Sequence, residues 1–340
     1  MYRFNGPSDK SSSDLYGTDE DVNYNEPDPK EAKHVVFVII GKGRTPEEEE
    51  LQAKATNQIK KAFKIQDPDN SSKVIFMPIN WTLGLNLSQE TMESIKPSCS
   101  LDMQRMRRNF EDALFDVVFY VAPIFFAEIQ LSLTEELSKA WKTLSDKGFQ
   151  GKVSLMANGL ASVMVYDTIT GNDPPKAVNP VYIPRSYDSG EVNELFQELG
   201  EARGSVGDVK GRISSFCAKN LDFSIANIFL LGSPIGMFMA MRGIRAGELK
   251  LPYNTKVFNI YDQSDIFAYR LDPLISQEPT EAITLRQNTD FFESYPQGFD
   301  NRRDFVIDAP SFKFIGPTKP HIAYWKSEAL SQFLHTVLRN

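Results

Sequence analysis

Short runs of consecutive apolar, mostly β-branched residues constrain the fold of this chain more than any other feature. The first run, His34–Ile40, has the sequence HVVFVII and is followed by Gly41-Lys-Gly43. Similar runs recur along the chain, and most are followed by a stretch with helical periodicity. Runs that are apolar at every position are typical of strands buried on both faces of a parallel sheet. The sequence therefore predicts an α/β fold with a doubly wound, mostly parallel sheet.

The same patterns set the expected element boundaries. The predicted strands are 34–40, 73–79, 153–157, 226–231, 255–261 and 304–308. The predicted helices are 46–63, 103–133 with a break at Pro123, 134–145, 160–168, a short one over 191–201, 237–246 and 324–338. The stretches 171–185 and 277–303 are rich in proline or polar residues, which indicates long insertions between elements.

Residues 1–33 differ in composition from the rest of the 340-residue chain. They are polar and contain eight acidic residues against four basic ones. Such a composition predicts a disordered acidic lead. The remainder, 34–340, is then expected to form one large domain.

Composition also excludes several classes of protein. The net charge of −8 argues against a nucleic-acid partner. Two cysteines, Cys99 and Cys217, are too few for a disulfide framework or a four-thiolate zinc site. No run approaches the roughly 18 apolar residues of a membrane span, and the first thirty residues lack a signal-peptide core. We therefore expect a cytoplasmic location.

The third predicted strand ends in a turn that has the pattern of a nucleophile elbow. Ala157-Asn-Gly-Leu-Ala161 stands between a strand and a helix, the context of the Gly-x-Ser-x-Gly turn of hydrolases. That turn needs small residues two positions before and after its centre, and Ala157 and Ala161 are small. The central residue is Gly159, which has no side chain to present. The pattern predicts an elbow without a nucleophile; an ordinary strand-to-helix turn is the alternative.

Several segments, taken in their order along the chain, resemble the DDHD-domain family of intracellular phospholipases, which prefer phosphatidic acid. Gly151–Ser162 has the sequence GKVSLMANGLAS and falls where the family has Gly-His-Ser-Leu-Gly-Ser. The other similar segments are 34–43, 74–81, 116–123, 229–236 with Arg242-Gly243, 258–270, and 304–306 with 321–325. The resemblance implies an α/β-hydrolase-like domain over 34–340. It also implies association with endoplasmic reticulum or Golgi membranes.

The resemblance assigns site residues by position. The order Ser–Asp–His of a hydrolase triad falls here on Gly159, Asp265 and His321. The histidine would take a proton from the nucleophile, and the aspartate would orient the histidine. Backbone N–H groups of Leu160 and of the Gly41–Lys42 turn would form the oxyanion hole.

The departures from the family concentrate at the elbow. Gly159 replaces the serine, Ala157 and Asn158 replace the Gly-His before it, and Ala161 replaces the glycine after it. Other serines nearby, Ser154, Ser162 and Ser233, are not at an elbow position.

Plainer roles remain open for the other assigned residues. Asp265 also suits the cap of the turn after its strand, and His321 suits an ordinary loop histidine. Asp304 also suits pairing with a nearby base. No cofactor is expected. A divalent metal on Asp265, Asp304 and His321 is the alternative, although their wide spacing is unlike that of ligand motifs.

Three functional hypotheses follow. In the first, the protein is a phospholipase-like pseudoenzyme that acts in lipid binding, scaffolding or regulation of an active relative. Its partners would be a phospholipid such as phosphatidic acid, a membrane surface and another protein. In the second, it is an active ester hydrolase that uses water or a nucleophile outside the elbow. In the third, it is a metal-binding module.

Overall fold

A computed structural model describes ten stretches of the chain. They are residues 26–40, 46–66, 73–82, 117–118, 120–121, 123–170, 221–252, 254–285, 303–307 and 324–339.

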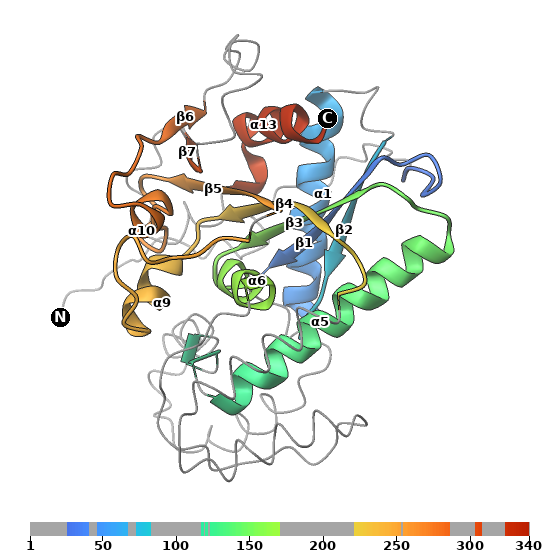
Figure 1. Ribbon diagram of the computed structural model, residues 1–340. Coiled ribbons are helices and arrows are strands. Elements are labelled where there is room, and N and C mark those ends of the chain that lie inside the picture. Colours follow the sequence, from blue (N-terminus) through green and yellow to red (C-terminus); the bar gives the residue numbers. More distant parts are fainter. Residues whose placement is uncertain are drawn as a thin grey trace, which may run out of the picture.

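The described part forms one α/β domain around a seven-stranded sheet (Figure 1). Its strand order is β2-β1-β3-β4-β5-β7-β6, and every neighbouring pair is parallel. The strands are β1 (His34–Ile40), β2 (Val74–Ile79), β3 (Lys152–Asn158), β4 (Ile225–Leu231), β5 (Lys256–Asp262), β6 (Ile283–Leu285) and β7 (Asp304–Ile307). The predicted parallel sheet is confirmed.

Helices cover both faces of the sheet, so the predicted double winding is also confirmed (Figure 1). On one face lie α5 (Pro123–Asp146), α6 (Leu160–Thr170) and α9 (Ile235–Met241). On the other face lie α1 (Pro46–Gln66), the 3₁₀ helix η5 (Tyr324–Lys326) and α13 (Glu328–Leu338). A short helix, α10 (Asp272–Ile275), follows β5.

The run in β1 shows why the strands are apolar at every position. Val35 and Phe37 belong to the core beneath α5 and α6, whereas Val36 and Val38 belong to the core beneath α1 and α13. All four side chains are fully buried. Successive side chains of a strand point to opposite faces, so a strand between two helical layers needs apolar residues on both.

The predicted break in the helix at Thr134 is wrong. A single helix, α5, begins at Pro123 and runs through to Asp146. The Thr134 hydroxyl donates to the Gln130 carbonyl one turn back, so it bonds inside the helix and does not cap a new one.

Helices α1 and α6 extend two or three residues beyond their predicted ends, and two other helices differ more. Helix α9 ends at Met241, before the predicted 246, because Gly243 adopts a left-handed φ of +70° that stops the helix. The predicted helix over 324–338 is divided into η5 and α13. Ser327 lies between them, and its side chain accepts a hydrogen bond from Leu330 N–H as the N-cap of α13.

The polar stretch 277–303 was predicted to be irregular, but it contains β6, a three-residue strand at the edge of the sheet. Residues 26–33 also differ from prediction. Their composition predicts that they belong to the disordered lead, yet Ala32 is buried in the core and Lys33 N–H donates to the Lys73 carbonyl. Residues 1–25 lie outside the described part of the chain.

Candidate functional site

Because all neighbouring strands are parallel, the carboxyl ends of the described strands lie at the same edge of the sheet. The strand order changes direction between β1 and β3, which is where open α/β sheets form their ligand crevice. Ile40 at the end of β1 pairs with Asn158 at the end of β3. Gly41 and Lys42, the predicted oxyanion residues, follow Ile40 but lie outside the described residues.

Gly159 forms the predicted sharp turn between β3 and α6. It has a φ of +58°, in the left-handed region that glycine adopts at little cost. Its N–H donates to the Leu231 carbonyl over 2.9 Å, and the Asn158 side-chain amide donates to the same oxygen over 3.1 Å. The turn is therefore fixed on β4, and its central residue has no side chain.

Small buried residues pack around this turn. Ala157 and Ala161 are fully buried, as the elbow pattern requires. Ser162 is also fully buried, and its Oγ lies within hydrogen-bonding distance of the Gly159 carbonyl and of Ser233 Oγ. The Ser233 hydroxyl is equally buried and accepts from Ile235 N–H. Neither hydroxyl faces solvent, so neither is an accessible nucleophile.

Leu160, whose N–H is the other predicted oxyanion donor, is the first residue of α6 and is 8% exposed. The first N–H groups of a helix have no partner within that helix. A polarised oxygen bound at Gly159 would therefore meet an amide of the first turn of α6.

Asp265 lies in the loop that follows β5, two strands away from β3 in the sheet. It is 5% exposed. One carboxylate oxygen accepts from Phe267 N–H over 3.0 Å, and the other accepts from the Tyr324 hydroxyl over 2.8 Å. The turn-capping role is therefore present. The triad role of Asp265 stays a prediction, because His321 lies outside the described residues.

The Asp304 carboxylate has a structural role. Its Oδ1 accepts from the Asn259 side-chain amide and from Leu271 N–H, both over 2.8 Å. Its Oδ2 accepts from Asp272 N–H over 3.1 Å and lies 3.3 Å from Arg270 Nε. The carboxylate thus fixes the chain before α10 and pairs with a base. Within the described stretches, no group of three or more His, Cys, Asp or Glu side chains is placed to hold a metal ion.

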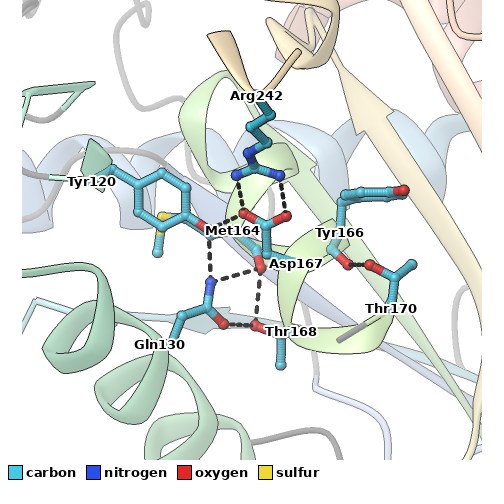
Figure 2. Close-up of polar contacts among 8 residues, drawn as sticks. All are labelled: Tyr120, Gln130, Met164, Tyr166, Asp167, Thr168, Thr170 and Arg242. Carbon is cyan, nitrogen blue, oxygen red and sulfur yellow. Dashed lines mark hydrogen bonds and ion pairs between the residues drawn. The ribbon is translucent and has the colours of Figure 1, made fainter. Parts of the chain in front are cut away.

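A buried polar network includes side chains of α6, the helix that follows the turn at Gly159 and is called the elbow helix below (Figure 2). Arg242 forms a two-point ion pair with Asp167 of α6, and the two side chains are 2% and 0% exposed. The Tyr120 hydroxyl donates to Asp167 and accepts from Gln130 Nε2, each over 2.7 Å. Burial, and then the charge of Asp167, raise the pKa of Tyr120 well above its ordinary value, so the hydroxyl stays protonated. The network joins α5, α6 and α9.

A serine–histidine hydrogen bond occurs away from the elbow, and sequence reasoning missed it. His34 Nε2 lies 2.7 Å from Ser154 Oγ, which also accepts from the Asn227 side-chain amide over 3.0 Å. Both His34 and Ser154 are buried, on the sheet face that α1 and α13 cover. Burial, then the charge of Lys152, lower the pKa of His34 to about 4, so this imidazole is neutral at pH 7. These residues bridge three strands and are buried.

Residues 221–286 match the model of the DDHD domain. This part of the chain is therefore similar to the DDHD domain. The match covers β4 to β6 and therefore contains Ser233, Arg242 and Asp265, whereas Gly159 lies before it.

Relatives extend this similarity over most of the chain. It is 27% identical over 279 residues to the protein named Phospholipase DDHD1 of Bos taurus, which covers 74% of this chain and 31% of that protein. It is 28% identical over 305 residues to Intracellular phospholipase A1 of Caenorhabditis elegans, covering 83% and 36%. It is 21% identical over 345 residues to Triacylglycerol hydrolase DDHD2 of Mus musculus, covering 73% and 48%.

The chain thus spans about a third of the length of the first two relatives. It is phospholipase-like in sequence, and the expected family resemblance is confirmed. In the described residues no helix is both long and apolar enough to cross a membrane.

Proposed function

We propose that this DDHD-domain protein is a pseudoenzyme that binds phospholipid at intracellular membranes and does not hydrolyse it. In this proposal it acts through lipid binding, scaffolding or regulation of an active relative. The observation that supports the proposal is Gly159, which occupies the centre of the elbow with a φ of +58° and no side chain. The position that should present the nucleophile to the site presents only backbone.

The serines nearest to the elbow do not offer a substitute. Ser154, Ser162 and Ser233 are each fully buried, and each is hydrogen-bonded to another polar group. A nucleophile must reach the substrate carbonyl, so a hydroxyl sealed in the core cannot serve. An enzyme that has lost its nucleophile keeps only about 10³–10⁴-fold catalysis over water, from its oxyanion donors and from binding.

The first test is hydrolysis of phosphatidic acid vesicles by the native protein and by its Gly159→Ser variant. We expect no turnover by the native protein and measurable turnover by the variant. Gly243→Ser is the matched control, because Gly243 also has a positive φ and has nothing within 4 Å of an added Cβ. It introduces the same residue in the same backbone conformation, away from the elbow, and should stay silent.

Two further results would contradict the proposal. Turnover by the native protein, with stoichiometric labelling of a serine by a fluorophosphonate probe, would establish an active hydrolase instead. Failure of the native protein to sediment with either phosphatidic acid or phosphatidylcholine vesicles would remove the lipid-binding role. Binding to phosphatidic acid vesicles alone would support a headgroup preference.

A further inference from the structure

Exposed apolar side chains gather in the turn that follows β5. Six large hydrophobic side chains are exposed in the described stretches, and three of them, Ile266, Phe267 and Tyr269, lie within four consecutive positions. Their exposed fractions are 63%, 38% and 43%. The segment 263–269, called the apolar turn below, begins where the arrow of β5 ends (Figure 1). It therefore lies at the carboxyl edge of the sheet, the edge that also carries the turn at Gly159.

Hydrogen bonds hold the apolar turn in one shape. The Asp265 carboxylate is 5% exposed, and it accepts from Phe267 N–H over 3.0 Å and from the Tyr324 hydroxyl over 2.8 Å. Tyr269 N–H donates to the Ser233 carbonyl over 2.9 Å, which joins the turn to the segment after β4. The apolar side chains are thus exposed on a fixed backbone. A contact that buries them costs little further ordering of the chain.

The exposed surface of the apolar turn carries no charge. Asp265 is the one acidic or basic residue among 263–269, and it is buried. The other polar side chains at the start of the turn, Gln263 and Ser264, are neutral. Transfer of such a surface into a less polar medium removes apolar groups from water without stripping water from an exposed charge. Exposed apolar and aromatic side chains of this kind are typical of segments that lie in a membrane interface.

The size of the exposed patch favours a bilayer over a second protein as its occupant. A fully exposed aromatic side chain offers about 150–250 Å², so these three partly exposed side chains together present roughly 300 Å². A stable interface between two proteins needs about 800 Å² from each partner. A bilayer sets no such requirement, because each apolar group that enters its interface is removed from water by itself.

We propose that the apolar turn inserts into the surface of a lipid bilayer through Ile266, Phe267 and Tyr269. The proposal rests on the proposed function, because it names the part of the protein that meets the membrane when the protein binds phospholipid. Insertion turns the carboxyl edge of the sheet, and with it the turn at Gly159, toward the lipid. Because the contact is apolar, it does not require the anionic headgroups that basic side chains need.

The first test is co-sedimentation of the full chain with phosphatidylcholine vesicles, whose headgroups have no net charge. Ile266→Asp should weaken binding about 10-fold or more, because the burial of isoleucine is lost and a carboxylate must stay hydrated. Ile65→Asp is the matched control. Ile65 is 72% exposed and lies in the last turn of α1, which leads to the start of β2 at the opposite edge of the sheet. This variant should bind as the native protein does.

Salt separates apolar insertion from attraction between charges. Raising the NaCl concentration from about 0.1 M to about 0.5 M should change the binding of the native protein by less than about twofold, because salt screens charges and does not weaken apolar burial. A steep loss of binding over this range would mean that charged groups carry the contact, and it would overturn the proposal.

Fluorescence reports directly on whether the apolar turn enters the acyl region. In an Ile266→Trp variant, phosphatidylcholine with brominated acyl chains should quench the emission that the new tryptophan adds. In Ile65→Trp it should not. Both positions are exposed, so the melting temperature should stay close to that of the native protein. If Ile266→Asp does not fold, this quenching experiment decides.

The outcomes separate this proposal from the previous one. Undiminished binding by Ile266→Asp, or no quenching in bound Ile266→Trp, would exclude the apolar turn as the membrane contact and leave the lipid-binding role standing. Equal weakening by Ile65→Asp would exclude it as well. Native protein that binds phosphatidic acid vesicles alone would overturn insertion and support headgroup recognition. No binding to either kind of vesicle would overturn both proposals.

A second copy of the chain is the other occupant that the experiments distinguish. Analytical ultracentrifugation of the native protein should give a monomer at each concentration, or an assembly that Ile266→Asp leaves intact. A concentration-dependent dimer that Ile266→Asp abolishes, while vesicle binding is retained, would show that the apolar turn contacts another protein chain, and it would overturn the proposal.

Discussion

Arg242 and Asp167 form a buried two-point ion pair that joins the end of α9 to the elbow helix α6. Both charged side chains are buried and have lost their hydration. Each charge is therefore stabilised mainly by its partner. Asp167→Asn should lower the free energy of unfolding by about 3–5 kcal/mol, since it leaves a buried guanidinium without its counter-charge. Urea denaturation measures this.

The ion pair has an internal control. Lys142 and Asp146 form a surface pair on α5, with side chains 76% and 63% exposed. Lys142→Ala should cost less than about 1 kcal/mol, because solvent screens exposed pairs. Similar costs for the two variants would mean that burial does not govern the Arg242–Asp167 pair. Replacing both charges, with Asp167→Leu and Arg242→Met, should recover part of the loss.

The positive φ of Gly159 predicts how the elbow responds to substitution. Gly159→Ala should lower stability by about 1–2 kcal/mol, because a Cβ is strained in the left-handed region. Gly159→Asn should cost less, since asparagine tolerates this region better. Gly243→Ala, in the same conformation and with open space around it, should match Gly159→Ala in thermal denaturation. A much larger cost at Gly159 would indicate crowding at the elbow, which contradicts simple backbone strain.

Gly236 in α9 should resist replacement for a different reason. A Cβ there would lie 2.6 Å from Cγ of Tyr269, well inside van der Waals contact. Alanine normally favours a helix over glycine by about 1 kcal/mol, but here the clash should reverse the sign. Gly236→Ala should therefore destabilise the native protein and become neutral or stabilising in a Tyr269→Gly background, which also removes the Tyr269 Cβ that would lie 2.9 Å from the new side chain. A double-mutant cycle with denaturant unfolding measures this coupling; additive effects would exclude the contact.

Two buried groups give opposite pH dependences of stability. The pKa of His34 is lowered to about 4, so between pH 6.5 and 4 the unfolded state binds a proton that the folded state excludes. The contribution of neutral His34 to the stability of the fold is therefore fully present above pH 6.5 and is lost as the pH falls toward 4. Burial raises the pKa of Glu128 to about 7, so between pH 7 and 4.5 the folded state binds the extra proton. That effect increases stability on acidification.

We expect these two effects to oppose each other, each changing stability by about 2 kcal/mol between pH 7 and pH 5. Removing one of them should reveal the other. Compared with the native protein, His34→Gln should gain about 2 kcal/mol on going from pH 7 to pH 5, and Glu128→Gln should lose about as much. Unfolding in urea at both pH values measures the change for each variant. Parallel pH profiles for all three proteins would refute the assignment.

Much of the architecture could be predicted because it follows from local patterns. A run such as His34–Ile40, apolar at every position, fits only a strand covered on both faces, and the structure has that strand between two helical layers. The sharp turn at Gly159 was predictable because a strand, two small residues around a glycine, and a helix are adjacent in the sequence. The continuity of α5 through Thr134 was not, since a threonine that bonds back to Gln130 looks in sequence like a cap.

Sequence alone determined the parallel α/β fold, the place of the sharp turn between β3 and α6 and the absence of a side chain at Gly159, because each depends on residues that are close in the chain. Only the tertiary structure decided which polar groups meet. It paired Arg242 with Asp167, placed the Tyr324 hydroxyl on Asp265 and assigned Asp304 to backbone amides. Such partners lie tens of residues apart, and their pairing is set by strand order and helix packing. Local patterns of polarity do not encode that geometry.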